Sequence, residues 1–124
     1  MARILILEDE PLIAMLLEDW LTEMGHEPVG PIDCVDTALA VLQNSQIDAA
    51  IVDINIRGRR SDPVAAVLQE RSIPYAFATG SPSDFIGECF STAPTLAKPY
   101  DFAAVGEVVG RLVMAGKALA AVDN

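Results

Sequence analysis

Short apolar runs alternate with longer stretches of helical periodicity along the whole chain. The run at residues 3–7 is continuously apolar after Arg3, which is typical of a strand covered on both faces. Further short runs follow at residues 49–52, 75–79 and 95–97, and residues 27–30 form a weak strand candidate. The candidate at 27–30 contains Pro28, so we expect this strand at an edge of the sheet.

Between these runs, apolar residues recur at helical spacing, which predicts amphipathic helices. The first helix has Pro11 in its first turn and Gly25 as its stop. Its apolar positions are Leu12, Ile13, Leu16, Leu17, Trp20, Leu21 and Met24, and Trp20 falls on the inward-facing period. The second helix has Val35, Ala38, Leu39 and Leu42. The third has Val64, Val67 and Leu68, with Ser61 or Asp62 as its cap. Asp101 is the predicted cap of the last helix.

Residues 81–92 fit a helix least well. The segment contains Pro82, Gly87 and few apolar residues that could face a core. We therefore expect it to be short, irregular or mobile, which makes it a degenerate fourth helix.

Alternating strands and helices predict an α/β fold with a parallel sheet and helices on both faces. Right-handed crossovers leave few topologies, and the flavodoxin-like strand order 2-1-3-4-5 is the common solution for five strands. No repeat, linker or low-complexity tract divides residues 1–124. We expect one domain with its core at 3–118 and a short tail at 119–124.

Composition and charge narrow the function classes. Hydrophobic residues make up 52% of the 124 residues and charged residues 21%, which is a globular composition. The net charge of −10 argues against nucleic acid or anionic lipid as a partner, because phosphate binding needs clustered Lys and Arg. The one basic cluster, Arg57, Arg59 and Arg60, occupies a single loop.

The cysteines and the termini bear on the compartment. Cys34 and Cys89 are far apart and have no CxxC motif, so a disulfide scaffold or zinc site is not expected. Met1 leads directly into the first apolar run, without a secretory signal, and we expect a cytoplasmic protein. The apolar segment 102–122 carries Glu107, Arg111 and Lys117, which indicates a packed helix and not a membrane span.

Polar residues with distinct chemistry follow four of the predicted strands. Glu8-Asp9-Glu10 follows the first, Asp53-Ile54-Asn55 ends the third, Thr79-Gly80 ends the fourth and Lys98-Pro99 follows the fifth. In a parallel sheet of this kind, ligands bind beyond the carboxyl ends of the strands. We therefore expect these groups to converge at one edge.

The converging groups suit phosphoryl transfer. Close carboxylates repel by roughly 4 kcal/mol per pair at an intermediate dielectric, so such a cluster needs a cation. Oxygen ligands alone favour Mg²⁺. With Mg²⁺ bound, the Asp53 carboxylate can attack a phosphoryl group, while Thr79 and Lys98 contact its oxygens. Each residue alone has an ordinary explanation as a helix cap, a turn residue or a solvated charge. Those explanations give no reason for all four to lie at successive strand ends.

The motifs Glu8-Asp9-Glu10-Pro11, Asp53, Thr79-Gly80 and Lys98-Pro99-Tyr100 resemble the receiver domains of bacterial response regulators. The resemblance extends from residue 3 to about 118, in the family's order and spacing. It implies that Asp53 is the phosphoacceptor, Thr79 the switch hydroxyl and Lys98 the phosphate contact. It also implies Mg²⁺ bound by Asp9, Asp53 and the backbone carbonyl of Asn55, with Glu8 holding the ion through water. The Lys98–Pro99 bond matches a bond that is commonly cis in the family.

The sequence departs from the family's pattern at two places. Thr95 stands where an aromatic switch residue is usual, and Asn55-Ile56-Arg57-Gly58 stands where a Met-Pro pair is commoner. Phe77-Ala78-Thr79-Gly80 is similar to a subgroup with a poorly formed fourth helix, which pairs with histidine kinases of the HWE or a related type. This predicts ordinary phosphorylation with an unusual readout, through ordering of residues 81–92.

The expected function is a stand-alone receiver that accepts a phosphoryl group from a histidine kinase. It would signal through an unknown downstream protein, or act as a phosphate sink or relay. Slow hydrolysis of its acyl phosphate would not make it an enzyme. The lone His26, in a turn, has no expected catalytic role.

Other functions on the same fold stay open as hypotheses. A Mg²⁺-dependent phosphohydrolase needs a general acid at the position of Asn55, and an amide cannot serve as one. Flavin or nucleotide binding needs a phosphate loop after the first strand, where Glu8-Asp9-Glu10 would repel phosphate. A pseudo-receiver that only binds partners does not account for the intact Asp9, Asp53, Thr79 and Lys98.

The last helix raises the hypothesis of a homodimer. Gly106 and Gly110 lie four residues apart and could admit a neighbouring helix, although ordinary packing explains them as well. The apolar residues of this helix exceed what one inward face needs: Val105, Val108, Val109, Leu112, Val113 and Met114.

Overall fold

The computed structural model describes residues 1–80, 90 and 93–122. For residues 117–122 it describes only the backbone. Apart from Phe90, the segment 81–92, with its predicted irregular structure, lies outside the described residues.

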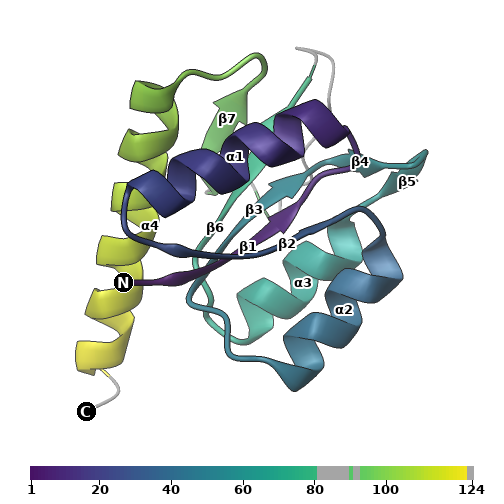
Figure 1. The fold of residues 1–124 in the computed structure, drawn as a ribbon. Helices are drawn as coiled ribbons and strands as arrows, with labels where there is room; N and C mark the ends of the chain where they lie inside the picture. Colours follow the sequence, from purple (N-terminus) through teal and green to yellow (C-terminus); the bar gives the residue numbers. More distant parts are fainter. Residues whose placement is uncertain (81–89, 91–92, 123–124) are drawn as a thin grey trace.

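Five parallel strands form the central sheet in the order β2-β1-β3-β6-β7 (Figure 1). Their bounds are β1 (Arg3–Leu7), β2 (Glu27–Ile32), β3 (Ala49–Asp53), β6 (Tyr75–Thr79) and β7 (Thr95–Ala97). The two intervening strands form a separate hairpin, so this order is the predicted 2-1-3-4-5. The predicted fold class is therefore confirmed, and β2 with its Pro28 lies at an edge as expected.

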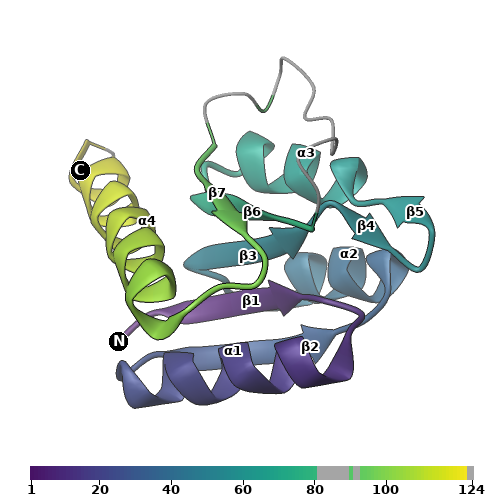
Figure 2. The same ribbon diagram turned by 90° about the horizontal axis from the view of Figure 1, so that it is seen from above.

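Helices cover both faces of the sheet (Figure 2). Helices α1 (Pro11–Glu23) and α4 (Phe102–Val122) lie on one face, and α2 (Val35–Asn44) and α3 (Asp62–Glu70) on the other. Alternate residues of β1 enter the two core layers: Ile4 packs on the side of α1 and α4, and Leu5 on the side of α2 and α3. This explains the continuous apolar run in the sequence, since both faces of the strand are buried.

Helix α1 is more apolar than its packing requires. Leu17 and Leu21 are buried, but Leu12 is 77% exposed and Leu16 40% exposed. Trp20, expected to face inward, is half-buried and packs edge-on against Phe102, with ring centroids 5.9 Å apart. The apolar positions of α1 thus cover a wider part of the helix surface than the stripe that is buried.

The cap of the last helix is confirmed, whereas the cap of α3 works differently from the prediction. Asp101 Oδ1 accepts a hydrogen bond from the Ala104 N–H at 2.7 Å. Ser61 occupies the N-cap position of α3 but makes no side-chain capping bond. Its buried hydroxyl instead donates to the backbone carbonyl oxygen of Asp53 at 2.5 Å. The hydroxyl thus links the start of α3 to the end of β3.

The sequence pattern did not predict the antiparallel hairpin of β4 (Asn55–Ile56) and β5 (Arg59–Arg60) that directly follows β3. Its two turn residues, Arg57 and Gly58, have φ of 53° and 78°. Positive φ at both positions is the geometry of a tight type I′ hairpin turn. Ile56 is buried and anchors the hairpin to the core beside α2 and α3.

Two further features bear on the predictions. None of the helices in the described part of the chain combines the length and the apolarity needed to cross a lipid bilayer. The Lys98–Pro99 peptide bond is cis, as the resemblance implied.

Candidate functional site

The carboxyl ends of β1, β3, β6 and β7 meet at one edge of the sheet, where the predicted groups converge. Asp53 is the last residue of β3 and Thr79 the last of β6. The Lys98 N–H donates to the Thr79 carbonyl oxygen at 2.8 Å, so the ends of β6 and β7 are held together. Parallel pairing alone therefore gathers side chains that lie up to 90 residues apart in the sequence (Glu8 to Lys98).

Lys98 lies at the centre of this group. Its Nζ is 2.7 Å from Asp53 Oδ2 and 2.9 Å from Glu8 Oε1, and the more distant Glu10 Oε1 is at 3.7 Å. The side chains of Lys98 and Asp53 are each 10% exposed, and that of Glu8 only 1%. One largely buried ammonium group thus forms ion pairs with two buried carboxylates.

Burial and charge act in opposite directions on these groups. Burial alone would lower the pKa of Lys98, but hydrogen bonds to Asp53 and Glu8 outweigh it and raise that pKa above its usual value. Burial raises the pKa of Glu8, and the hydrogen bond from Lys98 offsets this only in part. The site therefore keeps Lys98 charged and holds more carboxylate than its single cation balances.

Asp9 completes the acidic cluster from the exposed side. One carboxylate oxygen from each of Glu8, Asp9 and Glu10 lies within 4.8 Å of the other two, which is close enough to share a cation. Asp9 Oδ2 accepts a hydrogen bond from the backbone N–H of Arg57 at 2.9 Å. An all-oxygen donor set of this kind fits Mg²⁺. Asn55 follows Asp53 by two residues and is the exposed first residue of β4.

Tyr100, which had no predicted role, also contacts this cluster. Its buried hydroxyl donates to Glu8 Oε1 over a long 3.4 Å. Burial, and next the negative charge of Glu8, raise the pKa of Tyr100 above its usual value, so it remains a donor. The sequence feature that could have indicated a role for Tyr100 was its position two residues after Lys98. The hydroxyl of Ser61 was missed in the same way, because helix capping was the simpler expectation for a serine before Pro63.

Thr79, the predicted switch hydroxyl, and Thr95, at the position where the family usually has an aromatic residue, lie on the neighbouring strands β6 and β7. Thr79 is half-buried at the end of β6, and Thr95 is exposed on the edge strand β7. The aromatic rings of this region cluster around Phe77 on β6. The Phe77 ring contacts Tyr75 and Phe90 edge-on, with centroids 5.5 and 6.0 Å away. Among the described residues, an aromatic cluster therefore lies in the core layer on the side of α2 and α3, while position 95 carries no ring.

Known proteins resemble this chain both in sequence and in structure. No family model matches the chain. A curated relative, the Phyllosphere-induced regulator PhyR of Methylorubrum extorquens, is 35% identical over 113 residues. That alignment covers 88% of this chain but only 42% of the relative, so the chain spans less than half of that protein's length.

Solved structures give closer matches in length. The solution structure of SdrG from Sphingomonas melonis Fr1 is 46% identical and covers 91% of this chain and 97% of SdrG, with a TM-score of 0.82. A BeF3-activated conformation of SdrG matches with a TM-score of 0.76. The response regulator PhyR from Brucella abortus is 29% identical, with a TM-score of 0.83, over 99% of this chain and 52% of that one.

Proposed function

This chain belongs to the receiver-domain family of response regulators, and from that membership we propose that it is a cytoplasmic phosphorylation switch with Asp53 as its phosphoacceptor. One observation carries the proposal. Asp53 is the carboxylate that ends the central strand, and a buried Lys98 ammonium lies 2.7 Å from it. A carboxylate next to a cation at a strand end can attack a phosphorus atom and then share the resulting charge with that cation.

The chemistry follows from the positions of the side chains. An Asp53 carboxylate oxygen forms a bond to the phosphorus of a phosphohistidine, the phosphorus–nitrogen bond breaks, and the leaving imidazole takes up a proton. Lys98, already in contact with the same carboxylate, neutralises the phosphoryl oxygens, and the Thr79 hydroxyl donates to one of them. Mg²⁺, when held by Asp9, Asp53 and the Asn55 carbonyl, with Glu8 behind a water, supplies further charge neutralisation.

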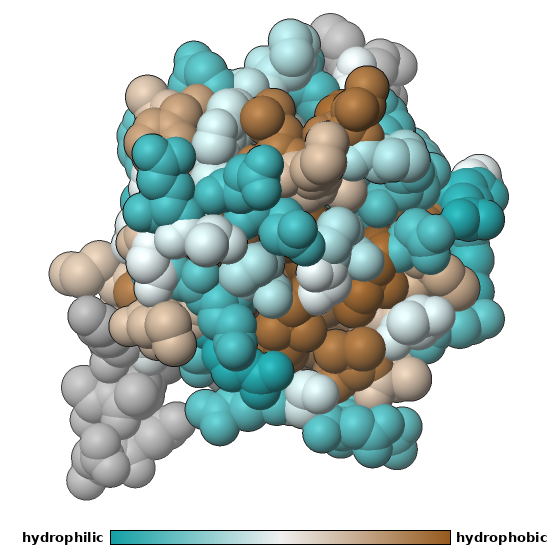
Figure 3. All heavy atoms as spheres, viewed as in Figure 1, coloured by the Kyte–Doolittle hydropathy of each residue, from teal (hydrophilic) through white to brown (hydrophobic). Residues whose placement is uncertain are grey.

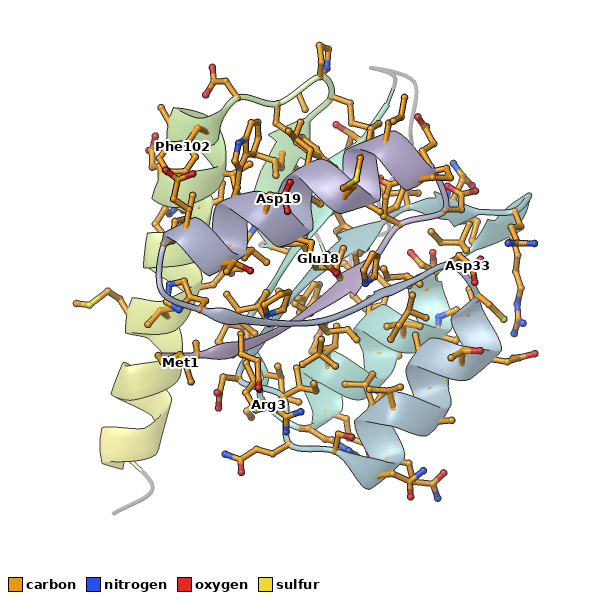
Figure 4. The ribbon with its side chains drawn as sticks, viewed as in Figure 1. Met1, Arg3, Glu18, Asp19, Asp33 and Phe102 are labelled. Atoms are coloured by element: carbon orange, nitrogen blue, oxygen red, sulfur yellow. The ribbon has the colours of Figure 1, made fainter. Side chains whose placement is uncertain are left out.

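A small phosphodonor tests the proposal directly. Purified protein treated with acetyl phosphate and Mg²⁺ should gain the mass of one phosphoryl group, and an Asp53→Asn variant should not. Asp19→Asn is a matched control, because Asp19 is an exposed carboxylate on the outer side of α1 (Figure 4). A gain that persists in Asp53→Asn, or no gain in the wild type, would contradict the proposal.

We further propose that the acyl phosphate hydrolyses slowly and that the chain is no enzyme in purpose. The second residue after Asp53 is Asn55, and its amide cannot act as a general acid for rapid turnover. The loss of the phosphoryl mass after removal of the donor measures this rate. Rapid multiple turnover of a phosphate ester would favour the phosphohydrolase instead.

The proposed donor, a histidine kinase of the HWE or a related type, would dock on the outer face of α1. Leu12, Met15 and Leu16 are exposed there, and Phe102 extends the apolar surface from α4. Figure 3 shows apolar side chains gathered over the end of α1 that Figure 1 draws in dark purple. This end lies next to Glu8, Asp9 and Glu10, so a partner bound there would bring its phosphohistidine to Asp53. The downstream protein that reads the phosphorylated form is a separate, unidentified partner.

A homodimer through α4 has a specific observation in its favour. A groove of about 930 Å³ runs between α4 and residues 72–75 and 93–94, and Gly106, Gly110 and Met114 line it. Glu107 and Arg111 lie on its rim, exposed, and within the described residues neither forms an ion pair. A second copy laid antiparallel across a twofold axis would place each Glu107 opposite the other copy's Arg111.

Charge reversal tests this dimer. Glu107→Arg and Arg111→Glu should each weaken self-association, and the double variant should restore it, as measured by sedimentation with and without beryllofluoride. The structure of SdrG in a BeF3-activated conformation supports the use of this phosphoryl mimic. A monomeric mass under all conditions would eliminate the dimer.

A further inference from the structure

Arg57 has a backbone conformation that its residue type disfavours. Its φ of 53° lies in the left-handed region, which residues other than glycine, asparagine and aspartate seldom adopt. Such outliers persist where the surrounding contacts hold them, and they concentrate at functional sites. The contacts around Arg57 therefore indicate what the conformation achieves.

Those contacts join three loops at the carboxyl edge of the sheet. The backbone N–H of Arg57, at the tip of the β4–β5 hairpin, donates to Asp9 Oδ2 at 2.9 Å. Its guanidinium donates to the Asp33 backbone oxygen at 3.0 Å and to Asp33 Oδ2 at 2.5 Å. Asp33 lies at the corner between β2 and α2, beside the hairpin (Figure 4). The side chain thus anchors the hairpin tip on one loop while the backbone holds a carboxylate of another.

In this left-handed turn the N–H of Arg57 points to Asp9. In that orientation one Asp9 oxygen accepts the hydrogen bond, and its Oδ1 remains available to a cation. A hydrogen bond that fixes a ligating carboxylate typically changes metal affinity by about 10–100-fold. The Arg57–Asp33 pair is unsuited to a purely stabilising role, since both side chains are more than half exposed and such pairs contribute little to folding.

We propose that Arg57 is a positioning residue for Asp9, which holds this carboxylate in place for Mg²⁺ through its backbone N–H and uses Asp33 as its anchor. The inference rests on the proposed function, in which Asp9 is a Mg²⁺ ligand. It assigns to the hairpin after the phosphoacceptor a part in loading the site. Arg57 itself touches neither the ion nor the phosphoryl group.

Titration of the full chain with Mg²⁺ alone, measured by calorimetry, distinguishes the effect of the Arg57 N–H from that of the Arg57–Asp33 anchor. Arg57→Pro has no N–H and cannot adopt positive φ, so Mg²⁺ affinity should fall by about tenfold or more. Arg57→Gly keeps the N–H and favours positive φ but lacks the anchor, so the loss should be smaller. Asp33→Asn should resemble Arg57→Gly. The matched control is Asp36→Asn, which removes the exposed partner of Arg59, and it should bind as the wild type does.

A second measurement does not depend on Mg²⁺ or on the folding of the proline variant. In the metal-free wild type, exchange of the Arg57 amide hydrogen should be slowed, and Asp9→Ala should remove this protection. If Arg57→Pro binds Mg²⁺ as tightly as the wild type, or the amide is unprotected, the positioning role is wrong. If Asp9→Ala itself leaves Mg²⁺ affinity unchanged, the proposed metal site fails first, and the two failures are thereby distinguished.

Discussion

At the scale of single residues, the balance between Lys98 and its carboxylates dominates the site. Lys98 contacts Glu8 and Asp53, and all three side chains are largely withdrawn from water. A buried pair contributes little by itself, but the removal of one partner leaves an uncompensated buried charge. The stability of the metal-free protein should therefore depend on Lys98 more than on any surface cation.

Replacement of Lys98 by Met tests this dependence. Without Mg²⁺, Lys98→Met should lower the free energy of unfolding by about 3 kcal/mol, because Glu8 and Asp53 lose their cation. Chemical denaturation in the presence of a chelator measures the effect. Arg59→Met, which breaks an exposed pair with Asp36, should cost less than about 1 kcal/mol. Equal effects of the two substitutions would contradict the proposed balance.

His26 provides a pH-dependent contact far from the site. Its Nδ1 accepts a hydrogen bond from the Ala2 N–H at 3.1 Å, which requires an unprotonated nitrogen. Burial, and next the charge of the N-terminal amine, lower the pKa of His26 below its usual value. Below about pH 6.5 the unfolded chain therefore binds more protons than the folded one, and stability falls as the pH decreases.

The expected result is a loss of thermal stability in the wild type between pH 7.5 and 5.5 that exceeds the loss in His26→Gln. Comparison of the two proteins cancels the contributions of the carboxyl groups, which they share. Parallel pH profiles for both proteins would show that the His26 contact contributes nothing.

At the scale of elements, α1 and the β4–β5 hairpin differ from what their sequences suggested. In α1 a broad apolar period divides into a buried stripe, which contacts the sheet, and an exposed stripe beside the acidic cluster. Three large side chains left in water at one end of a helix exceed the scatter of single apolar residues that surfaces normally carry. The exposed stripe is therefore the part of α1 most suited to a partner.

Met15→Glu should separate docking from chemistry. Met15 is 52% exposed, so stability should change by less than about 0.5 kcal/mol, and phosphorylation by acetyl phosphate should be unchanged. Phosphotransfer from the cognate kinase should slow by about tenfold or more if Met15 lies at the centre of the interface. Ala40→Glu, which adds the same charge at an exposed position on α2, is the matched control. Equal transfer rates for both variants would show that the kinase docks elsewhere.

At the scale of the whole molecule, part of the net charge of −10 lies at the carboxyl edge of the sheet. Four carboxylates, Glu8, Asp9, Glu10 and Asp53, converge at one edge of the sheet with a single lysine among them. Their mutual repulsion opposes folding of the metal-free chain, and a bound cation relieves it. Folding and metal binding should therefore be coupled.

The coupling predicts that Mg²⁺ stabilises the protein. At a Mg²⁺ concentration 100 times the dissociation constant, the gain should be about 2.7 kcal/mol, which thermal unfolding detects as a raised Tm. Asp9→Asn should lose most of this gain. NaCl at equal ionic strength controls for general screening, and an equal gain from NaCl would argue against a specific site.

The sequence by itself determined the fold and the polar groups that the strand ends bring together. Apolar runs of strand length, separated by stretches of helical periodicity, specify the parallel sheet because its central strands must be buried on both faces. Asp53, Thr79 and Lys98 could be predicted to converge because the carboxyl ends of parallel strands share an edge. Local pattern and topology suffice for both conclusions, and the Asp101 cap is local in the same way.

Only the tertiary structure decided which of several possible partners each polar group takes. Ser61 had helix N–H groups nearby in sequence, but its hydroxyl makes no capping bond, and it donates to the Asp53 carbonyl. Tyr100 reaches Glu8, and the Arg57 N–H reaches Asp9, across 92 and 48 residues of sequence. The exposed apolar side of α1 could not be predicted either, because periodicity identifies apolar positions but not how much of the helix surface the rest of the protein buries. These outcomes depend on distances between elements, which a sequence pattern does not contain.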